Sequence, residues 1–324
     1  MADQNASLLS KIVTAVKELY VETSQSDRAR KTLTEFFLGF SVVPRGACMT
    51  LHGASGSGKT TLLKSFLCHD VPKLAGGEAG RALYVEVPSK CTLKSVAQAI
   101  LQALGDPAWN KGSGTDAAYR IGRILNAKGY RLLALDECQH MIESRNNRVH
   151  YDVADWIKSA INSWSIPVIL SGLPKIQEII AANDQLDGRR FRSAELGPMH
   201  WDVKNDQRDY RFVLKRCDEA LPFPQRAGLE DVTIAKNIHY LADGLLGKTT
   251  KLIILAAMNA ARGGLPAITT ESIGRAFEEL RGAADDVKGN PFSAAMNRPT
   301  GAAYSSPERL KPSGALHREL STKA

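Results

Sequence analysis

The chain has 324 residues, of which 44% are hydrophobic and 23% charged, with a formal net charge of +8 at pH 7. This length gives room for about two domains with buried cores, and the basic balance favours an acidic partner such as nucleic acid without establishing one. No apolar run approaches the ~20 residues of a membrane-spanning helix, the N-terminus has no signal pattern, and the five cysteines have no metal-ligand spacing. We therefore exclude a membrane or secreted class and expect a cytoplasmic protein with reduced thiols and no membrane partner.

Two helices are expected ahead of the first strand. Residues 6–22 place apolar side chains on one helical face, and a second helix, capped by Ser26, runs to Gly39. A basic cluster on this second helix either belongs to a helix packed on the core or faces DNA: Arg28, Arg30 and Lys31.

Residues 53–60 read Gly-Ala-Ser-Gly-Ser-Gly-Lys-Thr, between an apolar strand at residues 47–51 and a helical pattern. This order is typical of a phosphate-binding loop, because glycines let backbone N–H groups approach phosphate oxygens and the helix dipole favours an anion. Lys59 reaches the outer phosphates, and the Thr60 hydroxyl binds magnesium. The residues expected to hold the nucleotide are Gly53, Ser55, Gly56, Ser57, Gly58, Lys59, Thr60 and Thr61.

Strands and helices alternate after this loop. Strands are expected at residues 81–88, 131–137 and 166–172, and helices begin at Thr92 and near residues 115 and 149. The alternation predicts an α/β fold with a parallel sheet covered by helices on both faces.

Two of these strands end in polar residues, at the edge where parallel sheets bind ligands. Asp136 is placed to hold magnesium directly or through water, and Glu137 to activate the water that attacks the γ-phosphate. Ser171 has two interpretations: it senses the γ-phosphate, or it starts a turn with Gly172 and Pro174.

Further along, a charged segment carries three arginines in four positions: Arg189, Arg190 and Arg192. They form either a solvated turn or a group that projects into a neighbouring subunit's nucleotide site. A charged helix at residues 205–220 follows, and from Leu229 the apolar spacing predicts a small helical lid in which Lys248 or Lys251 senses phosphate.

Four segments are expected from these patterns. Residues 1–40 form N-terminal helices, 41–226 the nucleotide-binding core and 227–283 the helical lid. Residues 284–324 have few large apolar side chains and are expected to be largely disordered.

The order of these segments resembles AAA+ P-loop ATPases, and more narrowly the TniB/TnsC family of transposition regulators, to which the phage MuB protein is functionally related. The resemblance covers roughly residues 25–282. Its narrower part is carried by Val87-Pro88-Ser89, by Leu135-Asp136-Glu137-Cys138-Gln139-His140, and by Gln185-Leu186 with Arg190-Phe191.

The resemblance implies a protein that binds ATP and Mg²⁺, assembles on double-stranded DNA as a homo-oligomeric ring or helical filament, and recruits or activates a transposase. Hydrolysis would disassemble it, in a bacterial cytoplasm and on the nucleoid when bound to DNA. A separate target-selection protein or RNA-guided complex is a further partner under this resemblance. The roles of Lys59, Thr60, Asp136 and Glu137 carry over directly, and Arg190 is chosen over Arg189 for the inter-subunit role by its Phe neighbour.

In related regulators the residues just after the second strand hold DNA, which here means Lys90 and Thr92 with Lys94 close by. Binding would then use phosphates, with little dependence on sequence and a strong dependence on salt. The alternative is an ordinary helix cap at Thr92 and a solvated Lys90. The segment before Lys248 lacks the family's usual lid arginine, which puts phosphate sensing by the lid in doubt.

Two other functions are compatible with the same motifs. One is a replication initiator or helicase loader of the AAA+ type. The other is a nucleotide-gated DNA scaffold in which hydrolysis is incidental.

Overall fold

The computed structural model describes residues 2–40, 47–76, 81–89, 92–142, 147–181, 190–281 and 289–296. Contacts divide the chain into two compact units. The nucleotide-binding unit is Glu22–Pro198, and the helical unit combines the segment up to Val21 with the segment from Met199 onward. Within the described ranges, no helix is long and apolar enough to cross a membrane.

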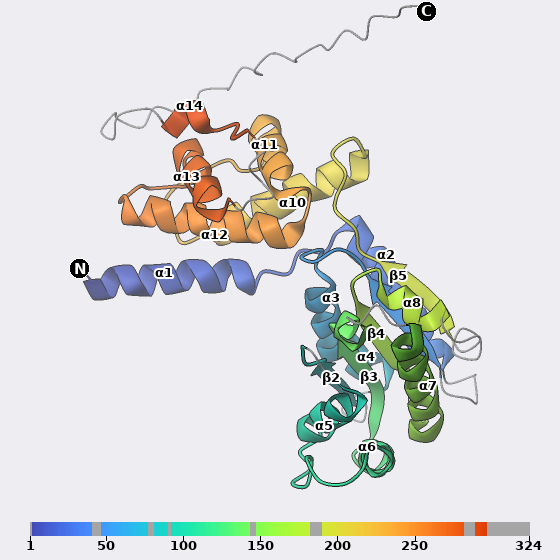
Figure 1. Ribbon diagram of the computed structural model, residues 1–324. Coiled ribbons are helices and arrows are strands. Elements are labelled where there is room, and N and C mark those ends of the chain that lie inside the picture. Colours follow the sequence, from blue (N-terminus) through green and yellow to red (C-terminus); the bar gives the residue numbers. More distant parts are fainter. Residues whose placement is uncertain are drawn as a thin grey trace, which may run out of the picture. The chain divides into compact units, whose positions relative to one another are not determined.

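A five-stranded parallel sheet forms the centre of the nucleotide-binding unit, in the order β2-β3-β4-β1-β5 (Figure 1). The strands are β1 Cys48–His52, β2 Arg81–Glu86, β3 Tyr130–Asp136, β4 Val168–Gly172 and β5 Arg190–Glu195. The register pairs His52 with Gly172 and Glu86 with Asp136. The carboxyl ends of these strands therefore meet at one edge, where a ligand of such a sheet binds.

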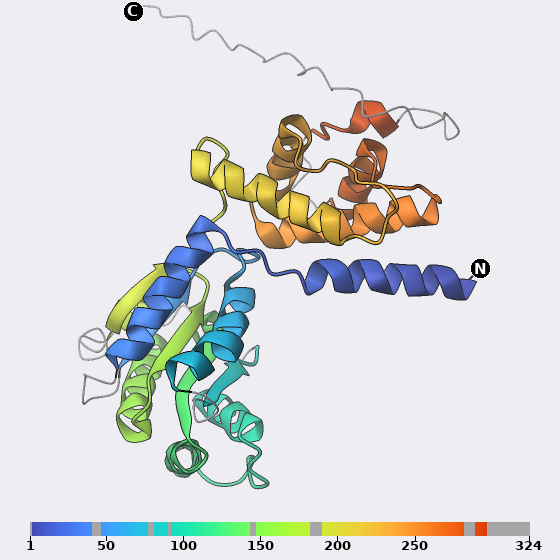
Figure 2. The same cartoon turned by 180° about the vertical axis from the view of Figure 1, so that it is seen from behind.

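Helices cover both faces of this sheet, as the sequence predicts. Figure 1 shows α7 and α8 in front of the sheet, and Figure 2 shows α2 and α3 on the opposite face. The helices of this unit are α2 Ser24–Gly39, α3 Lys59–Ser65, α4 Val71–Leu74, α5 Leu93–Ala103, α6 Gly114–Ala127, α7 Asn147–Trp164 and α8 Ile176–Ala181, with a π-turn at Phe66–Asp70 and a 3₁₀ turn at Cys138–Ile142. Every residue of β1 is buried, because alternate side chains enter the apolar clusters on opposite faces.

β5 is a strand that the sequence did not predict. Arg190 and Arg192 were expected in a solvated turn or in a group that projects into a neighbouring subunit's nucleotide site. The structure has residues 190–195 as a strand that pairs with β1 at the edge of the sheet, and the inter-subunit role stays a prediction. Ala194 is buried in a core cluster, and the Ser193 hydroxyl lies 2.8 Å from the hydroxyl of Thr50. Arg192 is exposed and pairs with Glu35 at 2.5 Å. Arg192, Ser193 and Glu195 are exposed and Ala194 is buried, so most of these side chains face solvent, as is common on an edge strand. The arginines make the segment resemble a charged turn in the sequence.

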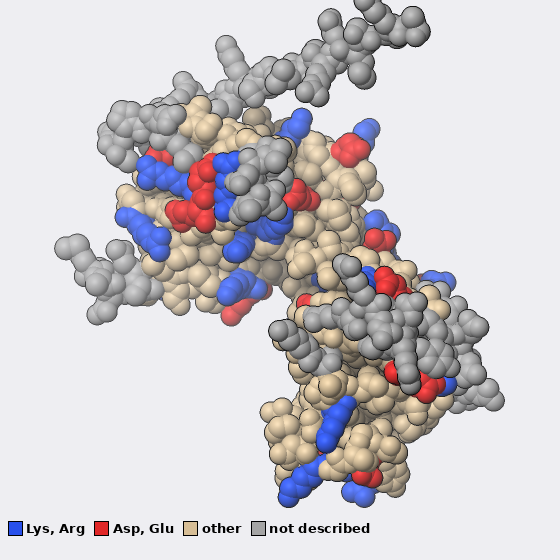
Figure 3. All heavy atoms as spheres, viewed as in Figure 1, with Lys and Arg blue, Asp and Glu red and all other residues tan. Residues whose placement is uncertain are grey.

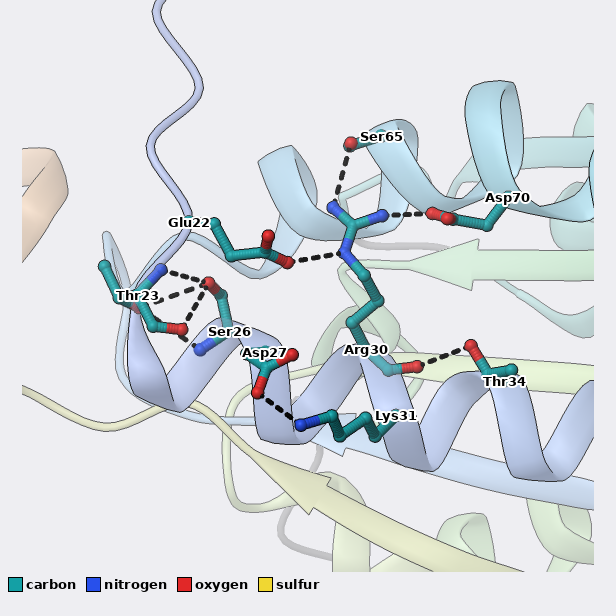
Figure 4. Close-up of polar contacts among 9 residues, drawn as sticks. All are labelled: Glu22, Thr23, Ser26, Asp27, Arg30, Lys31, Thr34, Ser65 and Asp70. Atoms are coloured by element: carbon teal, nitrogen blue, oxygen red, sulfur yellow. Dashed lines mark hydrogen bonds and ion pairs between the residues drawn. The ribbon is translucent and has the colours of Figure 1, made fainter.

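The helix that carries the basic cluster packs on the core. Arg30 extends from α2 toward the helix after the phosphate-binding loop, where it contacts Glu22, Asp70 and the Ser65 hydroxyl (Figure 4). Lys31 pairs with Asp27 one turn away on α2. Arg30 is therefore part of the packing of α2 on the core, whereas Lys31 is exposed and pairs only within its own helix, so a DNA contact by Lys31 stays a prediction.

The helical unit is a bundle that includes the first helix of the chain. Its helices are α1 Ala2–Lys17, α10 Lys204–Ala220, α11 Val232–Ala242, α12 Leu246–Arg262, α13 Thr270–Leu280 and α14 Ser293–Met296. Ile12 and Val16 of α1 are buried in the same cluster as Tyr210 of α10 and Ile253 of α12. On the face drawn in Figure 3, basic and acidic side chains of this unit lie next to each other, in agreement with ion pairs such as Arg275–Glu271.

This grouping differs from the expected segments in three places. α1 lies with the C-terminal helices instead of with α2, and α10 belongs to the bundle instead of the nucleotide-binding core. Within the segment expected to be disordered, residues 289–296 are ordered because Phe292 is fully buried and the Asn290 amide donates to the Gly274 carbonyl at 3.1 Å. The apolar faces of α1, α10 and the Phe292 segment share one core, which the sequence pattern of each element does not reveal alone.

Candidate functional site

The predicted loop joins β1 to α3 at the carboxyl edge of the sheet. Gly56 and Gly58 have φ of 77° and 97°, a region that favours glycine, and Gly58 is the residue from which α3 begins. A Cβ at Gly53 would lie 1.8 Å from the carbonyl oxygen of Leu196. Gly56 and Gly58 therefore allow a left-handed backbone, and Gly53 allows the Leu196 backbone to approach closely. Thr61 is exposed, as are Ser55 and Gly56.

Lys59 lies over the loop. Its Nζ donates to the carbonyl oxygens of Gly53 and Ala54, each at 2.9 Å, and only 6% of the residue is exposed. Burial lowers the pKa of Lys59, while the nearby Glu137 and Asp136 carboxylates raise it. The ammonium group is thus held in the loop and close to the acidic end of β3, which is the position from which it can meet phosphate.

Asp136 is fully buried and accepts four hydrogen bonds. Its Oδ2 accepts from the Thr60 hydroxyl at 2.7 Å and from the Tyr84 hydroxyl at 3.0 Å. Its Oδ1 accepts from the Ser171 hydroxyl at 2.6 Å and from the Glu137 N–H at 3.0 Å. A carboxylate has about four lone-pair positions, so protein donors already occupy those of Asp136. The structure therefore brings together Thr60, Asp136, Glu137 and Ser171, which the sequence nominated separately.

Tyr84 is a site residue that the sequence did not nominate. An aromatic residue inside an expected strand indicates core packing, and no motif points to its hydroxyl. The ring lies under Lys64, whose Nζ is 4.7 Å from the ring centroid. Burial raises the pKa of Tyr84 well above its usual range, and the Asp136 carboxylate adds to this, so the phenol stays a donor to Asp136.

Glu137 has an unusual backbone conformation. Its φ is 58°, in the left-handed region that non-glycine residues rarely adopt and that recurs at functional sites. The Gln139 amide donates to its Oε2, and the same amide accepts from the Leu173 N–H at 3.0 Å. In the sequence Gln139 is only one letter of the family signature, so its contact with Glu137 is known from the structure alone.

The expected arginine and DNA-binding residues are only partly described. Arg189 and Lys90 lie outside the described residues, and Arg190 is described only as the first residue of β5. Thr92 is the N-cap of α5 in a reciprocal capping box with Ser95, in agreement with the helix-cap alternative for its side chain. Their roles in DNA or nucleotide contacts stay predictions.

Two further lysines were nominated at a distance from the loop. Lys94 lies in the first turn of α5 and is exposed. Lys248 lies on α12 of the helical unit and pairs with Asp243 at 2.6 Å. A role for Lys248 in sensing phosphate stays a prediction.

The donor set at the loop fits a magnesium ion. In the part of the chain that the structure describes, no group of three or more His, Cys, Asp or Glu side chains could form a metal cage. The Thr60 hydroxyl and the Asp136 carboxylate are hard oxygen donors that meet at 2.7 Å. Mg²⁺ typically takes one or two protein oxygens of this kind and completes its shell with water and substrate phosphates.

The comparison with protein families decides the identity of the chain. The family described as bacterial TniB protein matches residues 11–201, which include the loop, the acidic strand end and β5. The chain belongs to the TniB family. No curated protein sequence matches it.

Solved structures share the fold of this TniB-family protein. The Aeropyrum pernix ORC2 protein, in ADPNP–ADP complexes, has a TM-score of 0.60 at 17% identity over 82% of this chain and 71% of that chain. The A. pernix ORC1 protein, in complex with DNA, has a TM-score of 0.63 at 16% identity over 83% and 69%. Cdc6p from Pyrobaculum aerophilum has a TM-score of 0.60 at 14% identity over 82% and 70%. The TniB-family chain therefore has the AAA+ fold.

The fold, the family and the loop together define the activity. The chain is an AAA+ ATPase. Lys59 contacts the loop backbone and Thr60 contacts Asp136, and their roles toward phosphate and magnesium stay predictions.

Proposed function

We propose that this protein is an ATP-dependent regulator of DNA transposition, which assembles on double-stranded DNA and recruits or activates a transposase. The observation that carries this proposal is the TniB family match over residues 11–201, a span that contains the assembled nucleotide site. Hydrolysis then acts as a timer that returns the assembly to free subunits.

Within the proposed site each residue has a separate task. Loop N–H groups and Lys59 bind the phosphates, and Thr60 and Asp136 would hold Mg²⁺, which supplies charge neutralisation on the phosphate oxygens. Because four protein donors occupy Asp136, a contact through water leaves those hydrogen bonds intact. Glu137 orients and deprotonates the attacking water as general base.

Arg190 is proposed to act on the nucleotide of a neighbouring subunit. The register pairs it with Cys48, the first residue of β1, whereas the phosphate-binding loop follows His52, the last. Four residues of strand separate these positions by about 13 Å, which places Arg190 toward the opposite edge of the sheet from its own loop. This placement supports a role in trans within a ring or filament.

The proposed DNA contact uses backbone phosphates. Lys94 is exposed in the first turn of α5, and Lys90 and Thr92 precede that helix. Two proteins with the same fold have been solved with DNA, the A. pernix ORC1 protein and the Drosophila ORC, the latter with a TM-score of 0.54 at 17% identity over 85% of this chain and 67% of that chain. These DNA complexes support DNA as the partner, since this chain also carries a net positive charge of +8.

A replication initiator or loader is the second candidate, because the ORC and Cdc6p structures share the fold. At 14–17% identity that likeness concerns the fold, whereas the TniB match concerns the family. The family match therefore favours transposition.

Assembly on DNA tests the proposal. Purified protein is mixed with linear duplex DNA and ATP, ADP or a slowly hydrolysed ATP analogue, and assemblies are imaged by electron microscopy. We expect ordered assemblies with the analogue and none with ADP, and the Glu137→Gln variant should assemble with ATP and persist. Equal assembly in all three nucleotide states would contradict the proposal.

The transposition step needs its own assay. The transposase of the same mobile element is added to these DNA-bound assemblies, and strand transfer is measured. We expect stimulation that requires ATP. A replicative helicase recruited in its place, with no effect on strand transfer, would favour the loader.

A further inference from the structure

The Gln139 amide bridges two segments of the nucleotide site. Gln139 lies in the 3₁₀ turn Cys138–Ile142, directly after β3. Its Nε2 donates to Glu137 Oε2, and its Oε1 accepts from the Leu173 N–H at 3.0 Å. The partners determine the orientation of the amide, because a carboxylate only accepts and a backbone N–H only donates.

Gly172 makes this bridge possible. It is the last residue of β4, directly after Ser171. A Cβ on Gly172 would lie 2.4 Å from Gln139 Oε1 and 3.2 Å from the Cys138 N. Any side chain at this position would therefore push the Gln139 amide away from the Leu173 N–H. The Gly172 carbonyl also accepts from the Gly53 N–H at 3.2 Å, so the bridge lies beside the start of the phosphate-binding loop.

Glu137 is held at its backbone as well as at its carboxylate. Its N–H donates to Asp136 Oδ1 at 3.0 Å, and its carbonyl accepts from the His140 N–H at 3.1 Å. These contacts keep a left-handed φ of 58°, a conformation that is unfavourable for a non-glycine residue. With the backbone fixed, the remaining freedom of Glu137 is in its side chain, and Gln139 is the group that restrains it at Oε2.

We propose that Gln139 is a positioning residue for hydrolysis, which holds the Glu137 carboxylate and ties it to the backbone at the end of β4. This inference rests on the proposed role of Glu137 as general base. The amide occupies Oε2 and leaves Oε1 to receive a proton from the attacking water. Because the other end of the amide is bonded to the Leu173 N–H, the carboxylate follows any displacement of the β4 end that carries Ser171.

The test uses three variants that leave the phosphate-binding groups in place. Gln139→Met keeps the side-chain length and removes both hydrogen bonds, and Gln139→Glu keeps an acceptor for the Leu173 N–H but replaces the donor to Glu137 with a second carboxylate. Gly172→Ala displaces the amide sterically. Gln102→Met, an exposed position on α5, is the matched control.

For all three variants we expect kcat for ATP hydrolysis to fall about 10–100-fold, the usual effect of a misplaced catalytic group, with KM and ATP affinity within about twofold of wild type. The control should keep the wild-type kcat. Affinity is measured by titration with a fluorescent ATP analogue, and the folded state of each variant is checked by its melting temperature.

Two results would overturn the inference. One is a wild-type kcat in the folded Gln139→Met and Gln139→Glu variants. The other is an equal loss of ATP affinity and kcat, which would indicate a structural role only. Glu137→Gln is assayed in parallel: if it hydrolyses ATP normally, the proposed base itself is wrong, whereas an inactive Glu137→Gln beside a normal Gln139→Met leaves the base in place and removes only Gln139.

Discussion

The Thr60 hydroxyl donates to Asp136 Oδ2 at 2.7 Å, although the two residues are 76 positions apart in the sequence. The sheet order brings them together, because β4 lies between β1 and β3 and its Ser171 bonds the same carboxylate. The two oxygens that a magnesium ion would use are therefore held in place by the fold. Fully satisfied buried polar groups of this kind rigidify a site, since an unpaired member would be costly.

Lys59→Ala should abolish ATP binding. The variant removes the buried ammonium that lies over the loop, and with it the charge that would face the phosphates. We expect the increase in melting temperature that ATP produces in the wild type to disappear. Lys73→Ala, an exposed lysine on α4, is the control and should keep that increase. A normal ATP-induced shift in Lys59→Ala would contradict the assigned role.

Tyr84→Phe should make the protein less sensitive to alkaline pH. Burial, and then the Asp136 carboxylate, hold the pKa of the Tyr84 phenol above its ordinary value near 10. Above pH 10 the unfolded chain releases this proton and the folded chain keeps it, so the free energy of unfolding falls as pH rises. The phenylalanine variant lacks this contribution, and its urea midpoint should fall less between pH 8 and pH 11.

A matched control for this pH effect is Tyr119→Phe, because Tyr119 is 71% exposed. We expect the same decrease in midpoint as in the wild type. If the urea midpoints of the Tyr84 and Tyr119 variants fell equally between pH 8 and pH 11, the Tyr84 phenol would not be the source of the pH effect.

Arg30→Met should destabilise the nucleotide-binding unit by about 2 kcal/mol, since hydrogen bonds to charged groups contribute ~1.5–3 kcal/mol when partly buried. Arg30 has contacts with Glu22, Asp70 and Ser65 (Figure 4), and its side chain is 17% exposed. Lys31→Met removes an ion pair whose lysine is 70% exposed, and should cost less than about 0.5 kcal/mol. Urea unfolding of both variants measures the difference, and equal losses of stability would contradict the assignment.

Arg190→Ala should lose ATPase activity alone and recover part of it when mixed with Lys59→Ala. In the mixture an intact loop from one subunit meets an intact arginine from the next, which neither variant provides alone. ATP hydrolysis is measured across mixing ratios, with Arg189→Ala and Arg192→Ala as comparisons. If Arg189→Ala shows this loss and recovery and Arg190→Ala does not, the inter-subunit role belongs to Arg189. If none of the three variants recovers activity in the mixture, the site is not shared between subunits.

Lys90→Gln with Lys94→Gln should weaken duplex DNA binding and reduce its dependence on salt. Removing one phosphate-neutralising lysine lowers the slope of log affinity against log salt by about one. Thr92 is left unchanged in this variant because its hydroxyl caps α5, and an alanine there would also destabilise the helix. Fluorescence anisotropy between roughly 50 and 300 mM salt, where such slopes are resolved, measures the effect, with Lys73→Gln as control. An unchanged slope would exclude both lysines from the DNA-binding surface.

The sequence by itself was sufficient for features that lie in one continuous stretch. The loop of residues 53–60, the acidic end of β3 at Asp136 and Glu137, and the start of α5 at Thr92 are all local patterns, and the structure has them where they were expected. The parallel sheet was also predictable, because strands buried on both faces are continuous apolar runs separated by helices. These features follow from backbone conformation and hydrophobic periodicity, which neighbouring residues determine.

Only the tertiary structure decided which distant groups meet. Tyr84 and Gln139 became site residues because the register and the strand order bring β2 and the end of β4 to the two carboxylates. The edge strand β5 and the grouping of α1 with α10 depend on which apolar face finds a partner. Such contacts join residues far apart in the chain, and their partners are selected by the packing of the whole unit, so no local pattern specifies them.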